Sequence, residues 1–132
     1  MRRLLLTCLL ILTCCSTAFA NRVKVRIFSN VTLECVYVSF DLGEYNLYAN
    51  DTNLLESMLG EGMSVELLKV KDSISVSING YHYGNYTQVR LEATDTACIM
   101  CMNPRGQKQR TYEGDLVVTL DKTKKLQLIT SK

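Results

Sequence analysis

The sequence has no tryptophan, one histidine and one proline in 132 residues. His82 is the sole histidine and the mature chain has no second closely spaced cysteine pair, so the sequence lacks the ligand spacing of a zinc site, and a nucleophilic triad would have a single base available to it. His82 lies between Tyr81 and Tyr83, a setting more typical of a surface neighbour than of a catalytic base. A glycine-rich phosphate loop is also lacking. We therefore predict no active site, no metal site and no cofactor.

Long apolar runs are lacking except at the N-terminus. There Arg2 and Arg3 precede the apolar run Leu4–Leu12 and the small-residue ending Ala18-Phe19-Ala20. This pattern is typical of a secretory signal peptide over residues 1–20, cleaved before Asn21. The run is too short and wrongly flanked for a membrane span, so we expect no transmembrane segment in the mature chain.

The leader places the protein outside the cytoplasm, either secreted or in the periplasm or cell envelope. A lipid anchor on Cys14 or Cys15 is a weaker alternative, because Thr13 or Cys14 would precede it where Gly, Ala or Ser is usual. Only the location would change with the anchor.

Net charge is lacking too, because loss of Arg2 and Arg3 with the leader lowers the formal charge from +2 to zero. The mature domain is expected to be neutral and exported, and it has no stripe in which basic and aromatic residues alternate. We therefore do not expect nucleic acid as a partner. Basic residues do gather near the end of the chain, at Arg105, Lys108, Arg110, Lys122, Lys124 and Lys125. These residues either face an anion or belong to a solvated loop and turn.

Three of the six cysteines remain after residue 20, namely Cys35, Cys98 and Cys101. An exported chain can form disulfides, so these residues form either one bridge with one thiol left over or three thiols. The Cys98–Cys101 spacing occurs in redox pairs and zinc sites, but the neighbouring residues alternate as in a strand, where positions three apart face opposite ways. The simplest interpretation is three small buried hydrophobic residues.

Alternating apolar and polar residues dominate the mature chain and predict a single all-β domain, a sandwich or barrel of antiparallel strands, with at most one short helix. The expected strands are 23–28, 31–40, 45–49, 64–70, 73–78, 88–93, 97–102, 116–120 and 126–130. Asn79-Gly80 predicts a type I′ turn that folds 73–78 back on Tyr81–Gly84. Asn53–Leu59 is the helix candidate, because Asn53 and Glu56 can form a capping box.

Seven tyrosines are the most suggestive polar feature, since sugar-binding surfaces stack aromatic rings on pyranose faces. The candidate glycan-facing residues are Tyr45, Tyr48, Tyr81, Tyr83 and Tyr112. Tyrosines are also ordinary half-buried strand residues. Glu113 and Asp115 could flank a sugar bond as in a glycosidase, although solvation beside a turn explains these carboxylates as well.

The segment Arg110–Ile129, together with Val23–Phe28 and Gly43–Tyr48, resembles the amino-terminal domain of the stage II sporulation protein D and amidase-enhancer family of cell-wall enzymes. In that family, the part resembling Lys125–Thr130 leads into a segment with the catalytic glutamate, which has no counterpart here. The resemblance therefore implies an exported, non-catalytic domain over residues 21–132. Its implied partners are peptidoglycan, a cell-wall amidase and a carboxy-terminal catalytic lobe that is missing.

Two further expectations concern partners. The hairpin Arg110–Thr130 is a candidate docking edge for the missing lobe, because its last strand ends the sequence with apolar side chains. Val31–Cys35 and Val89–Cys101 look like the two cysteine strands of an immunoglobulin-like recognition module, which is the alternative class. Against that alternative, the core tryptophan is lacking and Ile99 stands where the corner tyrosine belongs.

Overall fold

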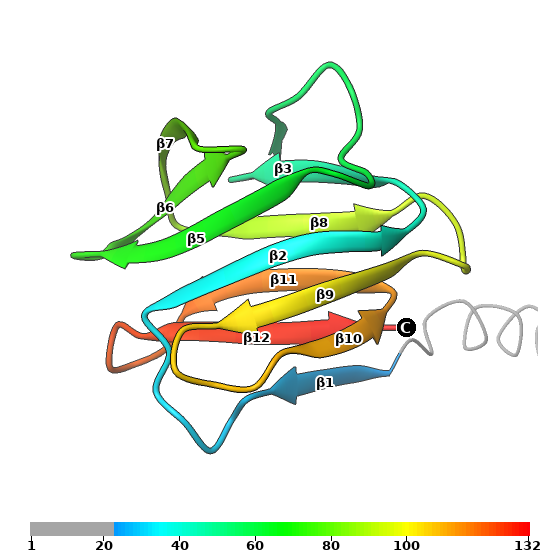
Figure 1. Cartoon of the computed structure of the whole chain (residues 1–132). Coiled ribbons are helices and arrows are strands. Elements are labelled where there is room, and N and C mark those ends of the chain that lie inside the picture. The colour runs from blue at the N-terminus through cyan, green and yellow to red at the C-terminus, as the bar shows by residue number, and fades with distance from the viewer. Residues whose placement is uncertain (1–22) are drawn as a thin grey trace, which may run out of the picture.

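A computed structural model describes residues 23–132 and shows two antiparallel β-sheets packed face to face (Figure 1). Its strands are β1 (Lys24–Ile27), β2 (Cys35–Leu42), β3 (Tyr45–Ala49), β4 (Thr52–Asn53), β5 (Ser64–Val70), β6 (Ser73–Ile78), β7 (Tyr81–Tyr86), β8 (Val89–Ala93), β9 (Ile99–Pro104), β10 (Arg110–Glu113), β11 (Asp115–Leu120) and β12 (Leu126–Ser131). The all-β prediction is confirmed, as a sandwich. The predicted leader and the cysteines within it lie outside the described residues.

Each sheet has six strands. Sheet A runs β1-β12-β11-β8-β3-β4, and sheet B runs β10-β9-β2-β5-β6-β7. Side chains that alternate toward the space between the sheets form one hydrophobic core. In β6, for example, Ile74, Val76 and Ile78 are buried, while the serines between them lie on the outer face. Each such buried side chain contributes about 1.5 to 3 kcal/mol to folding.

The hairpin predicted at Asn79-Gly80 is confirmed, and β6 pairs with β7 across it. Asn79 has a φ of 50° and Gly80 a φ of 84°, the two positive values that a type I′ turn needs. The Asn79 side-chain oxygen also accepts a hydrogen bond of 2.9 Å from the Ser64 amide, which fastens the turn to the start of β5.

Replacing Gly80 with valine is expected to lower the free energy of unfolding by about 1 to 3 kcal/mol, because a β-branched residue is disfavoured at positive φ. Nothing lies within 4 Å of the added Cβ, so backbone conformation alone should cause the loss. Gly80→Asn is the matched control, since asparagine tolerates this region, and it should lose less than about 1 kcal/mol. Equal urea midpoints for the valine variant and the wild type would contradict the turn assignment.

The helix predicted over Asn53–Leu59 is wrong, since this segment contains no helix. Its backbone groups bond to β3 instead: Leu59 exchanges two hydrogen bonds of 2.8 Å with Tyr45, and the Leu54 amide donates to Leu47 at 3.1 Å. The Asn53 side chain accepts from the amide of Leu55, two residues on, which is a turn and not a helix cap. The helix-like spacing of its leucines therefore serves packing against the edge of sheet A.

The hairpin predicted from 116–120 and 126–130 is confirmed, since β11 pairs with β12 along its length. The residues before it do not extend the same strand, however. At Gly114, with a φ of 86°, the chain leaves sheet B, where β10 pairs with β9, and enters sheet A, where β11 pairs with β8 and β12. Gly114 is therefore the point at which the chain crosses from one sheet to the other.

The docking-edge prediction for this hairpin is wrong, because β12 is an interior strand. It pairs with β11 on one side and with β1 on the other. Leu126, Leu128 and Thr130 point into the core and are at most 8% exposed. The strand that ends the hairpin therefore closes sheet A and offers no open edge.

Candidate functional site

The outer face of sheet B carries a line of polar side chains across five neighbouring strands. In register, Asn103 lies opposite Tyr37, Tyr37 opposite Glu66, Glu66 opposite Ser77, and Ser77 opposite His82. The residues before and after Asn103, Tyr37, Glu66 and Ser77 are buried in the core. Because side chains alternate between the two faces of a strand, these four side chains point to the outer face of the sheet. Tyr37 keeps 40% of its surface exposed. We call these five residues the polar row.

Small hydroxyl side chains surround the polar row. They are Ser39, Ser64, Ser73, Ser75 and Thr111. At one end of the row, His82 Nε2 lies 3.2 Å from Asn85 Oδ1, so the imidazole ring is held beside β6. Tyr37 is exposed and Glu66 is half-buried on this face. In Figure 1 the strands of this sheet cross in front of those of sheet A.

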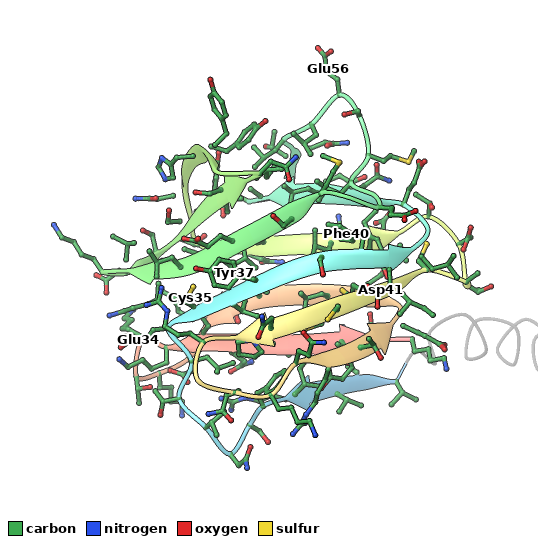
Figure 2. The ribbon with its side chains drawn as sticks, viewed as in Figure 1. Glu34, Cys35, Tyr37, Phe40, Asp41 and Glu56 are labelled. Carbon is green, nitrogen blue, oxygen red and sulfur yellow. The ribbon has the colours of Figure 1, made fainter. Side chains whose placement is uncertain are left out.

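A cavity of about 240 Å³ adjoins the row at the start of β2, lined by Thr32, Glu34, Cys35 and Arg105. Figure 2 shows Glu34, Cys35 and Tyr37 together at this end of β2, with Asp41 at the other end. A hydrogen bond with Tyr37 raises the pKa of the Arg105 guanidinium, which is charged at any physiological pH. The cavity thus places a cation beside Tyr37 of the polar row.

The thiol in this cavity is unsuited to nucleophilic chemistry. Burial raises the pKa of Cys35 above its usual value and outweighs the opposing effect of Arg105. Residues 23–132 also contain no group of histidine, cysteine and carboxylate side chains that could hold a metal ion. The chemistry that the described residues offer here is hydrogen bonding, ring stacking and charge.

All three described cysteines are unpaired and buried. Cys35 and Cys101 belong to β2 and β9 of the same sheet, and Cys101 lies opposite Ser39, four residues along from Cys35. That offset separates the two residues by about 13 Å, far beyond the reach of a disulfide. Cys98 instead packs near the Glu44 carbonyl, 3.4 Å from its sulfur. The structure therefore agrees with the interpretation of the three cysteines as buried thiols.

The five candidate tyrosines do not share a surface. Tyr45 is fully buried between the sheets, while Tyr48 lies on the outer face of sheet A with the Arg90 guanidinium 4.3 Å from its ring. Tyr81 and Tyr83 are exposed on β7, at one edge of sheet B. Tyr112 is on β10, at the other edge, where its ring contacts Phe28. Tyr37, on the central strand β2, is the tyrosine that the sheet presents among polar neighbours.

Two carboxylates considered from the sequence are also separated by the fold. Glu113 belongs to β10 of sheet B, with an ion pair to Lys132 of 2.7 Å, and Asp115 belongs to β11 of sheet A. Asp115 accepts a hydrogen bond of 2.9 Å from the Ala93 amide. The sheet crossing at Gly114 lies between the two residues. Each carboxylate thus has a polar partner of its own.

Tyr45 gives a prediction about stability. Its hydroxyl is the buried side-chain oxygen without a hydrogen-bond partner in the part of the chain that the structure describes, and burial raises its pKa. Tyr45→Phe keeps the ring contact with Phe40 and removes the unsatisfied group, so the free energy of unfolding should stay constant or rise by about 1 kcal/mol. Tyr45→Leu, which also loses the ring, should lower it by about 2 kcal/mol. A loss above 1 kcal/mol for the phenylalanine variant in urea unfolding would contradict this prediction.

No protein-family model, curated protein or solved structure matches this chain. In residues 23–132 no helix has the length and apolar character needed to cross a membrane. The site residues missed from the sequence are Tyr37, which was not among the five candidate tyrosines, and Asn103, Glu66 and Ser77, which are unremarkable until strand register aligns them with Tyr37.

Proposed function

We propose that this chain is a non-catalytic glycan-binding domain of a cell-wall protein, and that the outer face of sheet B is its binding surface. The observation that carries the proposal is the polar row, in which Asn103, Tyr37, Glu66, Ser77 and His82 align across five strands. The resemblance to the amidase-enhancer family supports peptidoglycan glycan as the ligand. By the same resemblance the active site is supplied by another lobe or by an amidase.

The chemistry of the polar row suits a sugar. An amide, a carboxylate, a hydroxyl and an imidazole provide donors and acceptors for sugar hydroxyls, and the exposed face of Tyr37 can stack on a pyranose ring. The row itself contains no lysine or arginine, so its centre favours neutral sugar units. Four of its five residues come from interior strands of a packed sheet, which hold them at fixed spacing, and His82 comes from the edge strand β7.

The immunoglobulin-like alternative receives no comparable support. Its hallmark is a disulfide between two sheets. Here the two cysteine strands, β2 and β9, are neighbours in one sheet, and both thiols are unpaired.

The test is titration of the domain with a hexamer of N-acetylglucosamine and with purified peptidoglycan glycan strands, followed by calorimetry. Tyr37→Ala should weaken binding about tenfold through loss of stacking, and Glu66→Gln should weaken it by a similar factor. Tyr48→Ala removes a tyrosine from the other sheet and is the matched control, which should bind as the wild type does. Reducing-end assays on the same samples should show no cleavage.

Two results would refute the proposal. One is the absence of binding to either glycan by a folded wild-type domain. The other is an equal loss of affinity in the Tyr37 and Tyr48 variants, which would place the ligand elsewhere.

A further inference from the structure

Three loops meet at one end of the sandwich around the segment Leu33–Cys35. Its three consecutive carbonyl oxygens each accept a backbone hydrogen bond from a different segment: Leu33 from Leu126 at 2.9 Å, Glu34 from Lys69 at 2.7 Å, and Cys35 from Arg105 at 3.0 Å. The β5–β6 turn, the β9–β10 loop and the β11–β12 turn are thereby held at the same end of the molecule.

These loops carry most of the cations near this end, which we call the basic end. Its basic side chains are Lys69, Lys71, Arg105, Lys108, Arg110, Lys122, Lys124 and Lys125, with Glu34, Asp72 and Asp121 as the acidic ones. Arg26 of β1 also reaches this end, where its guanidinium lies 3.5 Å from the Asp121 carboxylate. The basic residues between Arg105 and Lys125 already cluster in the sequence, and the fold brings Lys69 and Lys71 to the same end.

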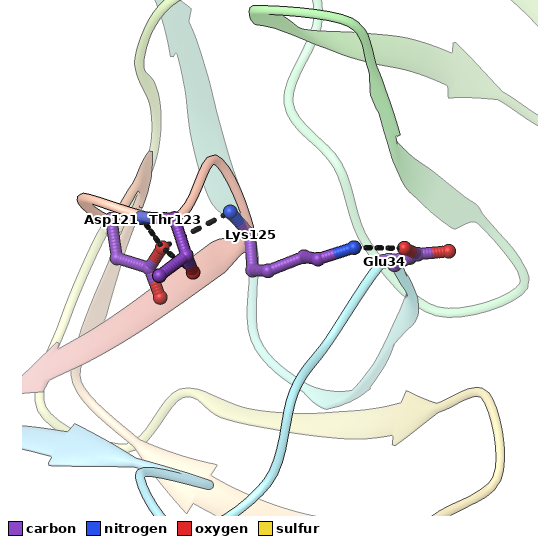
Figure 3. A network of polar contacts seen from close by, with 4 residues as sticks. All are labelled: Glu34, Asp121, Thr123 and Lys125. Carbon is purple, nitrogen blue, oxygen red and sulfur yellow. Dashed lines mark hydrogen bonds and ion pairs between the residues drawn. The ribbon is translucent and has the colours of Figure 1, made fainter.

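Glu34 is the internal counter-ion of the basic end. Its carboxylate pairs with the Lys125 ammonium, and that hydrogen bond lowers the pKa of Glu34, helped by the charges of Lys69 and Arg105. Asp121 orders the adjoining turn by accepting hydrogen bonds from the Thr123 amide at 2.8 Å and hydroxyl at 2.6 Å and from the Lys125 amide at 3.1 Å (Figure 3). The carboxylates of Glu34 and Asp121 therefore hold neighbouring residues of the basic end in place, and the basic side chains of this end still outnumber the acidic ones.

Two of the lysines occupy strained backbone positions. Lys71 has a φ of 54° and Lys124 a φ of 63°, in the left-handed region that glycine or asparagine adopts more easily. Each lies at the tip of a turn, where its side chain reaches solvent. The two turns therefore hold the charges of Lys71 and Lys124 out in solvent.

We propose that the basic end binds a carboxylate-bearing polysaccharide. Lysines spread over three loops suit a repeating anion better than a single small one, and Arg105 adds a planar guanidinium that can contact a carboxylate through two hydrogen bonds. Lys125 is already paired with Glu34, so the exposed lysines at the tips of the turns supply the charge for the ligand.

An anionic membrane is the less suitable partner. Membrane docking by charge alone is weak and is normally reinforced by an inserted apolar side chain or lipid. The exposed large apolar residues of the described chain are Val23, Val25, Tyr37, Leu42, Met58, Tyr81 and Tyr83, and none belongs to the three basic loops.

The test is binding to alginate, a polymer of uronic acids, in 20 to 500 mM salt, compared with neutral dextran, inorganic polyphosphate and phosphatidylglycerol vesicles. The double variant Lys71→Asn/Lys124→Asn removes two charges while asparagine keeps the turn conformation, so its fold should be at least as stable. Lys24→Asn removes one charge at the opposite end, where Lys24 pairs with Ser131, and is the matched control.

We expect alginate binding that weakens steeply with salt, an affinity about tenfold lower for the double variant, and no change for the control. Absence of alginate binding at the lowest salt, binding only to polyphosphate or vesicles, or equal losses in both variants would overturn the proposal. No lysine of these variants belongs to the polar row, so a failure here leaves the neutral-glycan test unaffected.

Discussion

We expect the Leu128→Lys variant to be unfolded at room temperature. Leu128 is fully buried on β12, between β1 and β11, and its side chain faces the second sheet. An ammonium group there would have no partner and would lose its hydration, a penalty of about 5 kcal/mol or more, comparable to the whole stability of a small domain. Circular dichroism and sedimentation velocity would show loss of the sheet signal and an expanded chain.

Ile129→Lys is the matched variant, because its side chain lies next along the same strand but points to the outer face of sheet A, where it is half-buried. It should fold and lose about 1 kcal/mol or less. A folded, monomeric Leu128→Lys protein would instead indicate that β12 is not an interior strand.

Gly114→Ala is expected to lower the free energy of unfolding by about 3 kcal/mol or more. Left-handed backbone costs alanine about 1 to 2 kcal/mol. In addition, its Cβ would clash with the carbonyl oxygen of Ser131, a backbone atom that can move only by disturbing the end of β12. Thermal and urea unfolding would measure the loss.

Gly106→Ala separates the two causes. Gly106 has a φ of 82°, but nothing lies within 4 Å of its added Cβ. Its loss should therefore be about 1 to 2 kcal/mol, from backbone conformation alone. If the two alanine variants were equally stable, the close approach of β12 to the sheet crossing would be refuted.

Local rules in the sequence were sufficient for much of the fold. Serines alternating with Ile74, Val76 and Ile78 predict a half-buried strand, and Asn79-Gly80 predicts the turn that follows, because both signals act between near neighbours. The segment Asn53–Leu59 was misread because its apolar spacing fits a helix as well as an edge segment. Only the distant strand β3, which supplies the hydrogen bonds, decides between them.

The candidate site was less accessible to sequence reasoning. The polar row depends on the register between β9, β2, β5, β6 and β7, and register is set by long-range pairing. Tyrosine content alone pointed to Tyr45, which is in the core, because a tyrosine has no sequence signal that separates an inward from an outward position when both neighbours are polar. The sequence predicted only part of the charge cluster for the same reason. Lys69 and Lys71 join it because the Lys69 amide bonds to the Glu34 carbonyl, a contact between distant parts of the chain.

The pairing of β1 with β12 has a consequence for how this protein is made. These two strands lie at opposite ends of the described sequence, and in residues 23–132 β1 pairs with no other strand. During synthesis, β1 therefore emerges from the ribosome long before its pairing partner exists, and sheet A is incomplete until β12 is available. Closing so long a loop makes folding slow, on the order of milliseconds to seconds for a sandwich of this kind. Throughout that interval Ile27 and Phe28, which the folded protein buries, remain exposed beside an unpaired backbone, the condition under which a nascent chain is prone to aggregate.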